Sequence, residues 1–241
     1  YVKVTKQTAN AMTARMKLVL QFSTALIASA VISYATPEAY RYSLTIPYFR
    51  DLALNLCWFY IPFAMIVITG ASNAVNLSDG LASGLLICSF AVFMLIAYTC
   101  GTAVAPHFTA FVIPAAGEIT VLCAAVIGGC LGFLWFNAPK AKVFMGDTGS
   151  LALGALLGTV AVMTKHEILL AIVGGVFVME TVSVMIQVAY FKKTGGKRFF
   201  KMAPVHHHFE QLGWPETTVV IRFWIMAFIL AVLGLASLLT L

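Results

Sequence analysis

The chain has 241 residues, of which 61% are hydrophobic and only 10% are charged. With a mean hydropathy of +0.95, this composition excludes an ordinary soluble domain, whose surface needs far more charge. The net charge of +6 does not require a nucleic-acid partner, because basic residues that anchor membrane spans against anionic lipids account for it. We therefore expect an all-α, polytopic helical membrane protein that forms a single integral-membrane domain over residues 1–241.

Apolar runs of about 20 residues, the length that crosses a bilayer as a helix, recur along the whole chain. They predict seven spans, at residues 17–34, 53–71, 82–100, 118–136, 150–164, 168–190 and 218–241. The fifth and sixth runs are separated by Lys165, His166 and Glu167 alone, so we expect a tight hairpin there.

The basic residues predict how these spans are oriented. Of the 15 Lys and Arg residues, 12 fall on one side of the predicted membrane, and Arg41, Arg50 and Lys165 fall on the other. The positive-inside rule then makes the connections at residues 73–81, 137–149 and 191–217 cytoplasmic. These connections carry most of the unusual polar residues, and we expect them to meet at one site.

The five cysteines are interpreted as small packing residues, because all lie in or beside apolar runs and show no Cys-x-x-Cys spacing. No disulfide or cysteine metal site is predicted.

The first polar connection contains Asn73, Asn76 and Asp79. Helix capping explains one or two polar residues at a helix end. The spacing of three residues instead places all three side chains on one helix face near the membrane surface, and this favours a functional role.

The second connection contains Asn137, Phe144 and the segment Gly146-Asp147-Thr148-Gly149-Ser150. Side-chain oxygens of Asn137 and Asp147 are of the hard kind that Mg²⁺ prefers, and the glycines let backbone N–H groups approach an anion. Phe144 offers a flat surface for a base or sugar. An ordinary turn that ends in a Ser150 N-cap explains the same residues equally well.

The third connection contains Pro204 and three consecutive histidines, His206, His207 and His208, after the basic run 192–201. An expression tag would lie at a terminus, and adjacent histidines diverge too much for a tetrahedral zinc site. Hydrogen bonding to phosphate or proton exchange suits these imidazoles better. The basic run anchors the chain at the membrane surface, and contact with a lipid phosphate is an additional possibility.

Glu180 lies in the middle of the sixth apolar run, where a carboxylate costs at least a few kcal/mol unless it faces a polar cavity or is protonated. A functional group and a helix-packing hydrogen bonder both remain open. Gly174 and Gly175 would let this long helix bend.

Four motifs together resemble the phospho-N-acetylmuramoyl-pentapeptide-transferase family, within the polyprenyl-phosphate N-acetylhexosamine-1-phosphate transferases. They are Asn73-Ala-Val-Asn-Leu-Ser-Asp-Gly-Leu, Phe133-Leu-Trp-Phe-Asn-Ala-Pro, Val143-Phe-Met-Gly-Asp-Thr-Gly-Ser-Leu and Met202-Ala-Pro-Val-His-His-His-Phe-Glu. The resemblance extends over nearly the whole chain. The triple histidine favours this family over its relatives that transfer N-acetylglucosamine 1-phosphate.

The resemblance implies transfer of a phosphosugar from UDP-N-acetylmuramoyl-pentapeptide to undecaprenyl phosphate, with release of UMP and a requirement for Mg²⁺. It also implies a homodimer in the bacterial cytoplasmic membrane, surrounded by membrane lipids, with the active site facing the cytoplasm and with no nucleic-acid partner. The bent sixth span would border a groove for the polyprenyl chain.

The resemblance also assigns roles to single residues. Asp147 would be the Mg²⁺ ligand, Asn137 and Phe144 would lie at the uridine pocket, and Lys3 matches the lysine of the family's Asp-Asp-x-x-Lys element. Two further groups would line the catalytic cleft or contact substrate phosphate or sugar: Asn73, Asn76 and Asp79 in the first, and His206, His207 and His208 in the second.

The chain departs from the family pattern in two places. The family continues Asp-Gly-Leu-Asp-Gly-Leu-Ala, whereas here Asp79-Gly80-Leu81 leads directly to Ala82, so three residues and one aspartate are absent. Tyr1 aligns just after the family's aspartate pair, so we expect the chain to be a C-terminal portion that is incomplete for catalysis by itself.

Alternative functions come from three classes. A sister enzyme would use UDP-N-acetylglucosamine, and a related membrane protein without catalysis would only bind. A transporter or channel would place its polar residues near the middle of the bilayer, and not in connections on one face.

Overall fold

The computed structural model describes residues 13–102, 111–138 and 142–238. Within this part of the chain, seven helices are long and apolar enough to cross a membrane, which confirms the all-α polytopic architecture. They are α2 (Ala14–Ala35), α3 (Tyr60–Leu77), α4 (Ala82–Gly101), α6 (Ala116–Asn137), α7 (Gly146–Thr164), α9 (Gly175–Lys193) and α11 (Glu216–Ala236).

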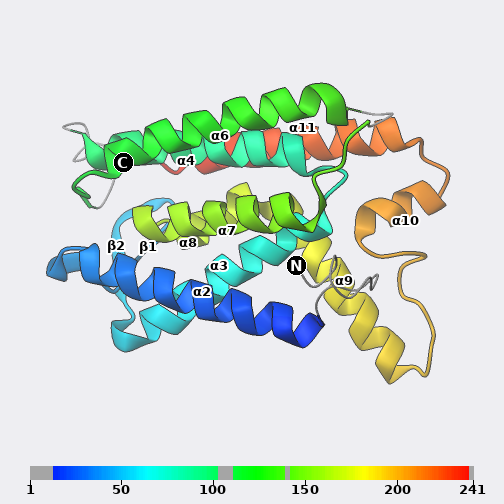
Figure 1. Ribbon diagram of the computed structural model, residues 1–241, viewed down its shortest axis with the longest axis horizontal. Coiled ribbons are helices and arrows are strands. Elements are labelled where there is room, and N and C mark those ends of the chain that lie inside the picture. The colour runs from blue at the N-terminus through cyan, green and yellow to red at the C-terminus, as the bar shows by residue number, and fades with distance from the viewer. Residues whose placement is uncertain (1–12, 103–110, 139–141, 239–241) are drawn as a thin grey trace, which may run out of the picture.

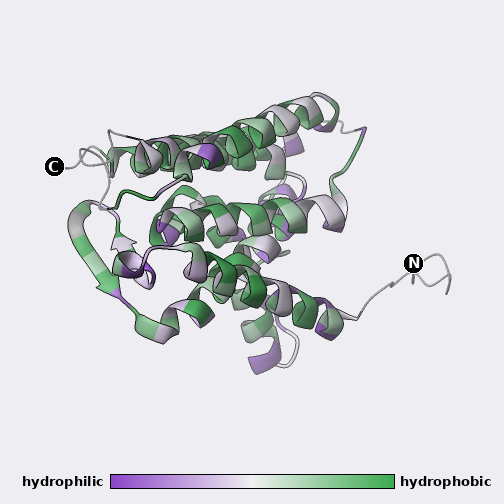
Figure 2. Cartoon of the chain, turned by 60° about the vertical axis from the view of Figure 1, so that its left-hand side comes forward, coloured by the Kyte–Doolittle hydropathy of each residue, from purple (hydrophilic) through white to green (hydrophobic). Residues whose placement is uncertain are grey.

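Most of these helices run back and forth along one long axis, so their connections gather at two ends (Figure 1). We call one end the site end; it holds the end of α3, the start of α7 and the short helix α10 (Val205–Gln211). The other is the hairpin end, where the strands β1 (Ser43–Ile46) and β2 (Phe49–Asn55) lie. Figure 2 shows hydrophobic residues along the helices and many of the hydrophilic ones near the helix ends.

The hairpin of β1 and β2 was not predicted from the sequence. The second span was expected to begin at residue 53, but residues 49–55 pair antiparallel with β1, with Ser43 opposite Asn55. One-turn helices η1 (Glu38–Tyr40) and η2 (Cys57–Phe59) flank the hairpin. The expectation was wrong because a short apolar run does not by itself distinguish a strand from the start of a helix.

The predicted sixth span is interrupted, at the place where the glycine pair suggested a bend. The helix α8 (Glu167–Val173) ends at Gly174, and α9 starts at Gly175. A Cβ on Gly174 would lie 2.8 Å from the carbonyl oxygen of Leu170, so this position admits no side chain without a backbone shift. The predicted tight hairpin is confirmed, since two residues separate α7 from α8.

Helices α3 and α7 approach each other closely through glycines of α7. A Cβ on Gly154 would lie 2.5 Å from the backbone oxygen of Ala71 and 2.8 Å from Cα of Ser72. A Cβ on Gly158 would lie 2.9 Å from Cα of Ile68. Small residues are how membrane helices obtain close packing, since lipid supplies little hydrophobic drive for association.

We predict that Gly154→Ala destabilises the protein by about 1–3 kcal/mol, because the added methyl group meets backbone atoms that cannot rotate away. Gly128→Ala on α6 is the matched control, since nothing lies within 4 Å of its Cβ position and alanine favours helix. Thermal unfolding in detergent should show a lower midpoint for Gly154→Ala and an equal or higher midpoint for Gly128→Ala. Equal midpoints for both variants would contradict the close approach.

At the hairpin end, a buried polar cluster ties the hairpin to the connection between α7 and α8. The buried Lys165 donates from Nζ to the carbonyl oxygen of Arg41 at 2.9 Å, and Nζ lies 4.1 Å from the ring centroid of Tyr60. Tyr60 donates its hydroxyl hydrogen to Glu167, and Thr45 donates to the carbonyl oxygen of Lys165.

His166 lies in the same connection and makes stability depend on pH. Burial lowers the pKa of its ring from 6.5 to about 4, although a hydrogen bond with the carbonyl of Thr164 acts in the opposite direction. In the unfolded chain the His166 ring is therefore protonated below about pH 6.5, whereas in the folded chain it is protonated only below about pH 4.

We therefore expect the His166 contribution to lower stability by up to about 3 kcal/mol as pH falls through this window. Thermal midpoints measured in detergent at pH 7 and pH 4.5 should differ less for His166→Asn than for the parent chain. His207→Asn, at a partly exposed histidine, should keep the parent's pH dependence. The same pH dependence in all three proteins would refute the assignment to His166.

Candidate active site

Polar side chains at the end of α3 contact the start of α7, at the site end. Asn76 accepts through Oδ1 from the hydroxyl of Ser150 at 2.7 Å, and Asp79 accepts through Oδ2 from the backbone N–H of Gly146 at 3.3 Å. One turn earlier, Ser72 donates to the carbonyl oxygen of Leu151 at 2.8 Å. Two of the predicted connections thus form one polar seam, which we call the α3–α7 seam.

Asn73 extends this seam to α2. Its Nδ2 donates to Oε1 of Gln21 at 3.0 Å and to the carbonyl oxygen of Thr69 at 2.9 Å. The sequence predicted Asn73, Asn76 and Asp79 on one helix face. Asn73 and Asn76 do lie in the last turns of α3, but the helix ends at Leu77, so the prediction was wrong for Asp79, which lies in the turn that follows.

Asp147 occupies the first turn of α7, next to the seam. Its side chain is 72% exposed, and its Oδ2 lies 2.8 Å from Nζ of Lys17 on α2. The partial positive charge of a helix N-terminus further favours a carboxylate there. Gly146 precedes it with φ of 64°, a conformation that glycine adopts without strain.

Carboxylate oxygens suited to a hard cation are present at this point. Asp147 faces solvent, and Oδ1 of Asp79 is enclosed without a hydrogen-bond partner among the described residues. Those residues contain no group of three or more His, Cys, Asp or Glu that could hold a metal ion alone. One or two carboxylates without further protein ligands suit an open Mg²⁺ site, because Mg²⁺ commonly takes one or two carboxylates together with water and substrate phosphates. They do not suit a metal site closed entirely by protein ligands.

Asn137 is buried, and its polar atoms are used within the protein. Its Oδ1 accepts from the hydroxyl of Ser83 at 2.9 Å, and its Nδ2 donates to the carbonyl oxygen of Val143 at 2.8 Å. It therefore fixes the connection that carries Phe144, a residue that is 67% exposed. Phe144 thus presents an exposed surface, and Asn137 holds the backbone next to it through the hydrogen bond to Val143.

The three histidines lie on α10, at the same end of the molecule as the α3–α7 seam (Figure 1). Their Nδ1 atoms face three different partners. His206 Nδ1 lies 3.0 Å from Oε2 of Glu180, and His207 Nδ1 lies 2.7 Å from Oε2 of Glu210. His208 Nδ1 accepts from the backbone N–H of Lys201 at 3.1 Å. This divergence agrees with the argument against a zinc site.

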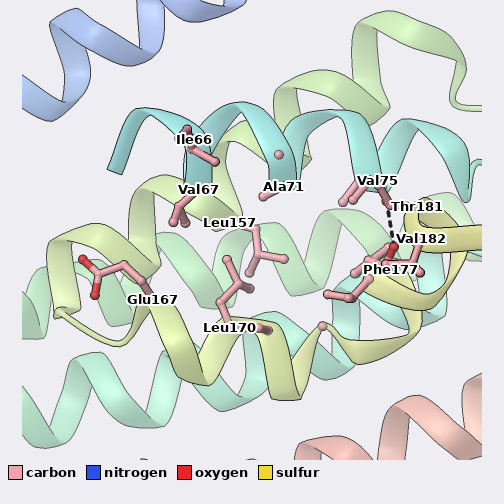
Figure 3. Close-up of a pocket in the computed structure, with 15 residues that line it drawn as sticks. Ile66, Val67, Ala71, Val75, Leu157, Glu167, Leu170, Phe177, Thr181 and Val182 are labelled. Carbon is pink, nitrogen blue, oxygen red and sulfur yellow. Dashed lines mark hydrogen bonds between the residues drawn. The ribbon is translucent and has the colours of Figure 1, made fainter. Parts of the chain in front are cut away.

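A largely apolar groove of about 250 Å³ runs between α3, α7, α8 and α9 (Figure 3). Its wall includes Ala74 and Val75, which directly precede Asn76, and Gly174 at the break between α8 and α9. Glu167 lies at one end, with its carboxyl group pointing away from the other labelled side chains. The break in the sixth span therefore borders this groove, whose α3 wall ends at Val75, next to Asn76 in the chain.

Sequence reasoning missed some site residues and misread another. Lys17 and Gln21, four residues apart on α2, were not singled out, although that spacing puts both on one helix face. Ser150 is not an N-cap, because α7 begins at Gly146 and the Ser150 hydroxyl bonds Asn76 and the carbonyl of Gly146 instead. Lys3 lies outside the described residues.

Comparison with known proteins agrees with this geometry. The model of glycosyl transferase family 4 matches residues 9–165, which include the α3–α7 seam, Asn137 and Asp147. The chain belongs to this family. It is also 56% identical to a phospho-N-acetylmuramoyl-pentapeptide-transferase of Caulobacter vibrioides (strain NA1000 / CB15N), over 99% of this chain. The chain spans 66% of the length of that curated relative.

We predict that Asn137→Ala destabilises the protein by about 2 kcal/mol, because it leaves the Ser83 hydroxyl and the Val143 carbonyl without their partner. Phe144→Ala is the control from the same connection, and its exposed ring should contribute little to stability. Thermal unfolding of both variants in detergent measures the difference. An unchanged midpoint for Asn137→Ala would contradict a stabilising role for these two hydrogen bonds.

Proposed function

We propose that the protein transfers phospho-N-acetylmuramoyl-pentapeptide from its UDP conjugate to undecaprenyl phosphate and releases UMP. The observation that carries the proposal is the α3–α7 seam, which brings Asn76 and Asp79 to the turn that holds Asp147. Family membership and the similarity to the Caulobacter vibrioides protein support it. The basic bias of the sequence supports an orientation in which the site end faces the cytoplasm of a bacterial inner membrane.

Asp147, with Asp79 beside it, would hold the Mg²⁺ ion that this reaction class uses. When bound, such an ion neutralises charge on a pyrophosphate as it is broken. Lys17 already contacts Asp147 and supplies a second positive charge at the same place. The carboxylates and this lysine thus provide complementary contacts for a metal and for phosphate oxygens.

The acceptor lipid would use the groove. Its apolar wall suits an isoprenoid tail. On α3 this wall includes Ala74 and Val75, which directly precede Asn76 in the chain. With its headgroup at the site end, a lipid whose tail lay in the groove would bring its phosphate near the α3–α7 seam and Asp147. The exposed Phe144 ring, supported by Asn137, would stack on the uracil of the donor.

The test measures UMP release by the purified protein at its full natural length, in detergent with Mg²⁺ and undecaprenyl phosphate. UDP-N-acetylmuramoyl-pentapeptide should support release, and UDP-N-acetylglucosamine should not. Asp147→Asn should lower the rate on the order of a hundredfold, which corresponds to about 3 kcal/mol of lost charge stabilisation.

Glu216→Gln is the matched control, since Glu216 is another exposed acid in the first turn of a helix and should keep nearly full activity. Release with UDP-N-acetylglucosamine alone would favour the sister activity. No UMP from either donor would refute the enzyme assignment.

A further inference from the structure

Glu180 on α9 is fully buried, and its contact with α10 indicates that the histidines differ in which ring nitrogen carries hydrogen. Glu180 has no exposed surface, and its Oε2 lies 3.0 Å from Nδ1 of His206. Its Oε1 is enclosed and has no hydrogen-bond partner among the described residues. A carboxylate inside a spanning helix costs at least a few kcal/mol, so the contact with His206 is its main compensation.

The chemistry of this contact decides which nitrogen of His206 carries hydrogen. An ionised carboxylate only accepts, so Nδ1 of His206 donates to Glu180 when Glu180 is ionised. In a neutral imidazole the other nitrogen, Nε2, then has a bare lone pair. Among the described residues, none forms a hydrogen bond with this Nε2.

His208 shows the opposite arrangement, two residues away. Its Nδ1 accepts from the backbone N–H of Lys201, so Nδ1 cannot carry hydrogen. The neutral ring therefore holds its hydrogen on Nε2 and presents a donor. One seven-residue helix thus carries one histidine with a bare Nε2 and one with an Nε2–H.

We propose that Glu180 is a positioning residue that holds His206 as the neutral Nδ1–H form, with Nε2 as an acceptor for a substrate hydroxyl or amide N–H. His208 presents Nε2–H to a phosphate oxygen. An ionised phosphate oxygen accepts hydrogen bonds and cannot donate them. This assignment rests on the proposed function for its substrate, because a phosphosugar carries both kinds of group. The orienting contact itself is a property of the chain alone.

Glu210 provides an internal comparison. It contacts Nδ1 of His207 at 2.7 Å, but these side chains are 31% and 37% exposed, whereas those of Glu180 and His206 are 0% and 7% exposed. A hydrogen bond that competes with water orients a ring less firmly than one that is enclosed. Removing Glu210 should therefore matter less than removing Glu180.

The experiment records two-bond ¹H–¹⁵N spectra of the full-length protein with ¹⁵N-labelled histidine rings, near neutral pH in detergent. Single His→Gln variants assign the signals. His206 should show the pattern of a protonated Nδ1 and a bare Nε2, and His208 should show the reverse. An Nε2–H form or an imidazolium at His206 would overturn the proposal, whether or not UMP is released.

Substitutions at Glu180 supply the second readout. Glu180→Leu should convert the His206 signals to the other neutral form and lower kcat on the order of ten- to a hundredfold. Glu180→Gln keeps an oxygen acceptor, so it should keep the His206 pattern and lose less activity. Glu210→Leu should leave the His206 and His208 signals unchanged.

Loss of activity in Glu180→Leu and Glu180→Gln to the same extent, with the His206 pattern unchanged in both, would show a structural role only. Should Glu180→Leu fail to fold, the spectra of the parent and of Glu180→Gln still decide the tautomer. If the parent releases no UMP, the proposed function is refuted and the tautomers are judged from the spectra alone.

Discussion

The site depends on the close packing of α3 against α7. Gly154 and Gly158 let the two backbones approach, and the same register then brings Ser72 to Leu151, Asn76 to Ser150 and Asp79 to Gly146. Each contact lies about one turn further along α3, so packing inside the membrane sets the geometry of the seam at its surface. Lipid gives little hydrophobic drive for this association, which makes small residues and interhelical hydrogen bonds the main stabilising features.

The same helix pair is also tied at the hairpin end. There the hydroxyl of Tyr60, at the start of α3, donates to Glu167 of α8 and lies 3.3 Å from the carbonyl oxygen of Val162 of α7. Helices α3 and α7 are thus fixed at both ends and in the middle. The α10 helix is attached differently, through Glu180 of α9 and through Phe209, which stacks on Trp214 with ring centroids 4.7 Å apart. The seam therefore belongs to a closely packed pair of helices, and the histidines belong to a separately anchored short helix.

The sequence predicted the spanning helices and the gathering of Asn73, Asn76, Asp79 and Asp147, because apolar length and helical spacing carry that information directly. The bend at Gly174 was visible as a glycine pair. The hairpin of β1 and β2 was not predictable from an apolar run that fits either structure. The burial of Asn137, the Lys17 contact and the pairing of Glu180 with His206 depend on residues far apart in the chain, and no local pattern encodes them.

The placement of polar groups also separates the enzyme reading from a transporter. A transporter needs polar groups along a path through the bilayer, with a site near the midplane. Here Asn76 and Asp79 lie at the end of α3 and Asp147 lies at the start of α7, and the groove beside α3 is lined mostly by apolar residues. Glu180 is the residue that suggested a polar path, but its carboxylate is enclosed and directed to His206 of α10. Because Glu180 is directed towards α10, it belongs to the site end and not to a polar path through the bilayer, and under the proposed function the apolar tail of the acceptor and the charged donor would meet at one membrane surface.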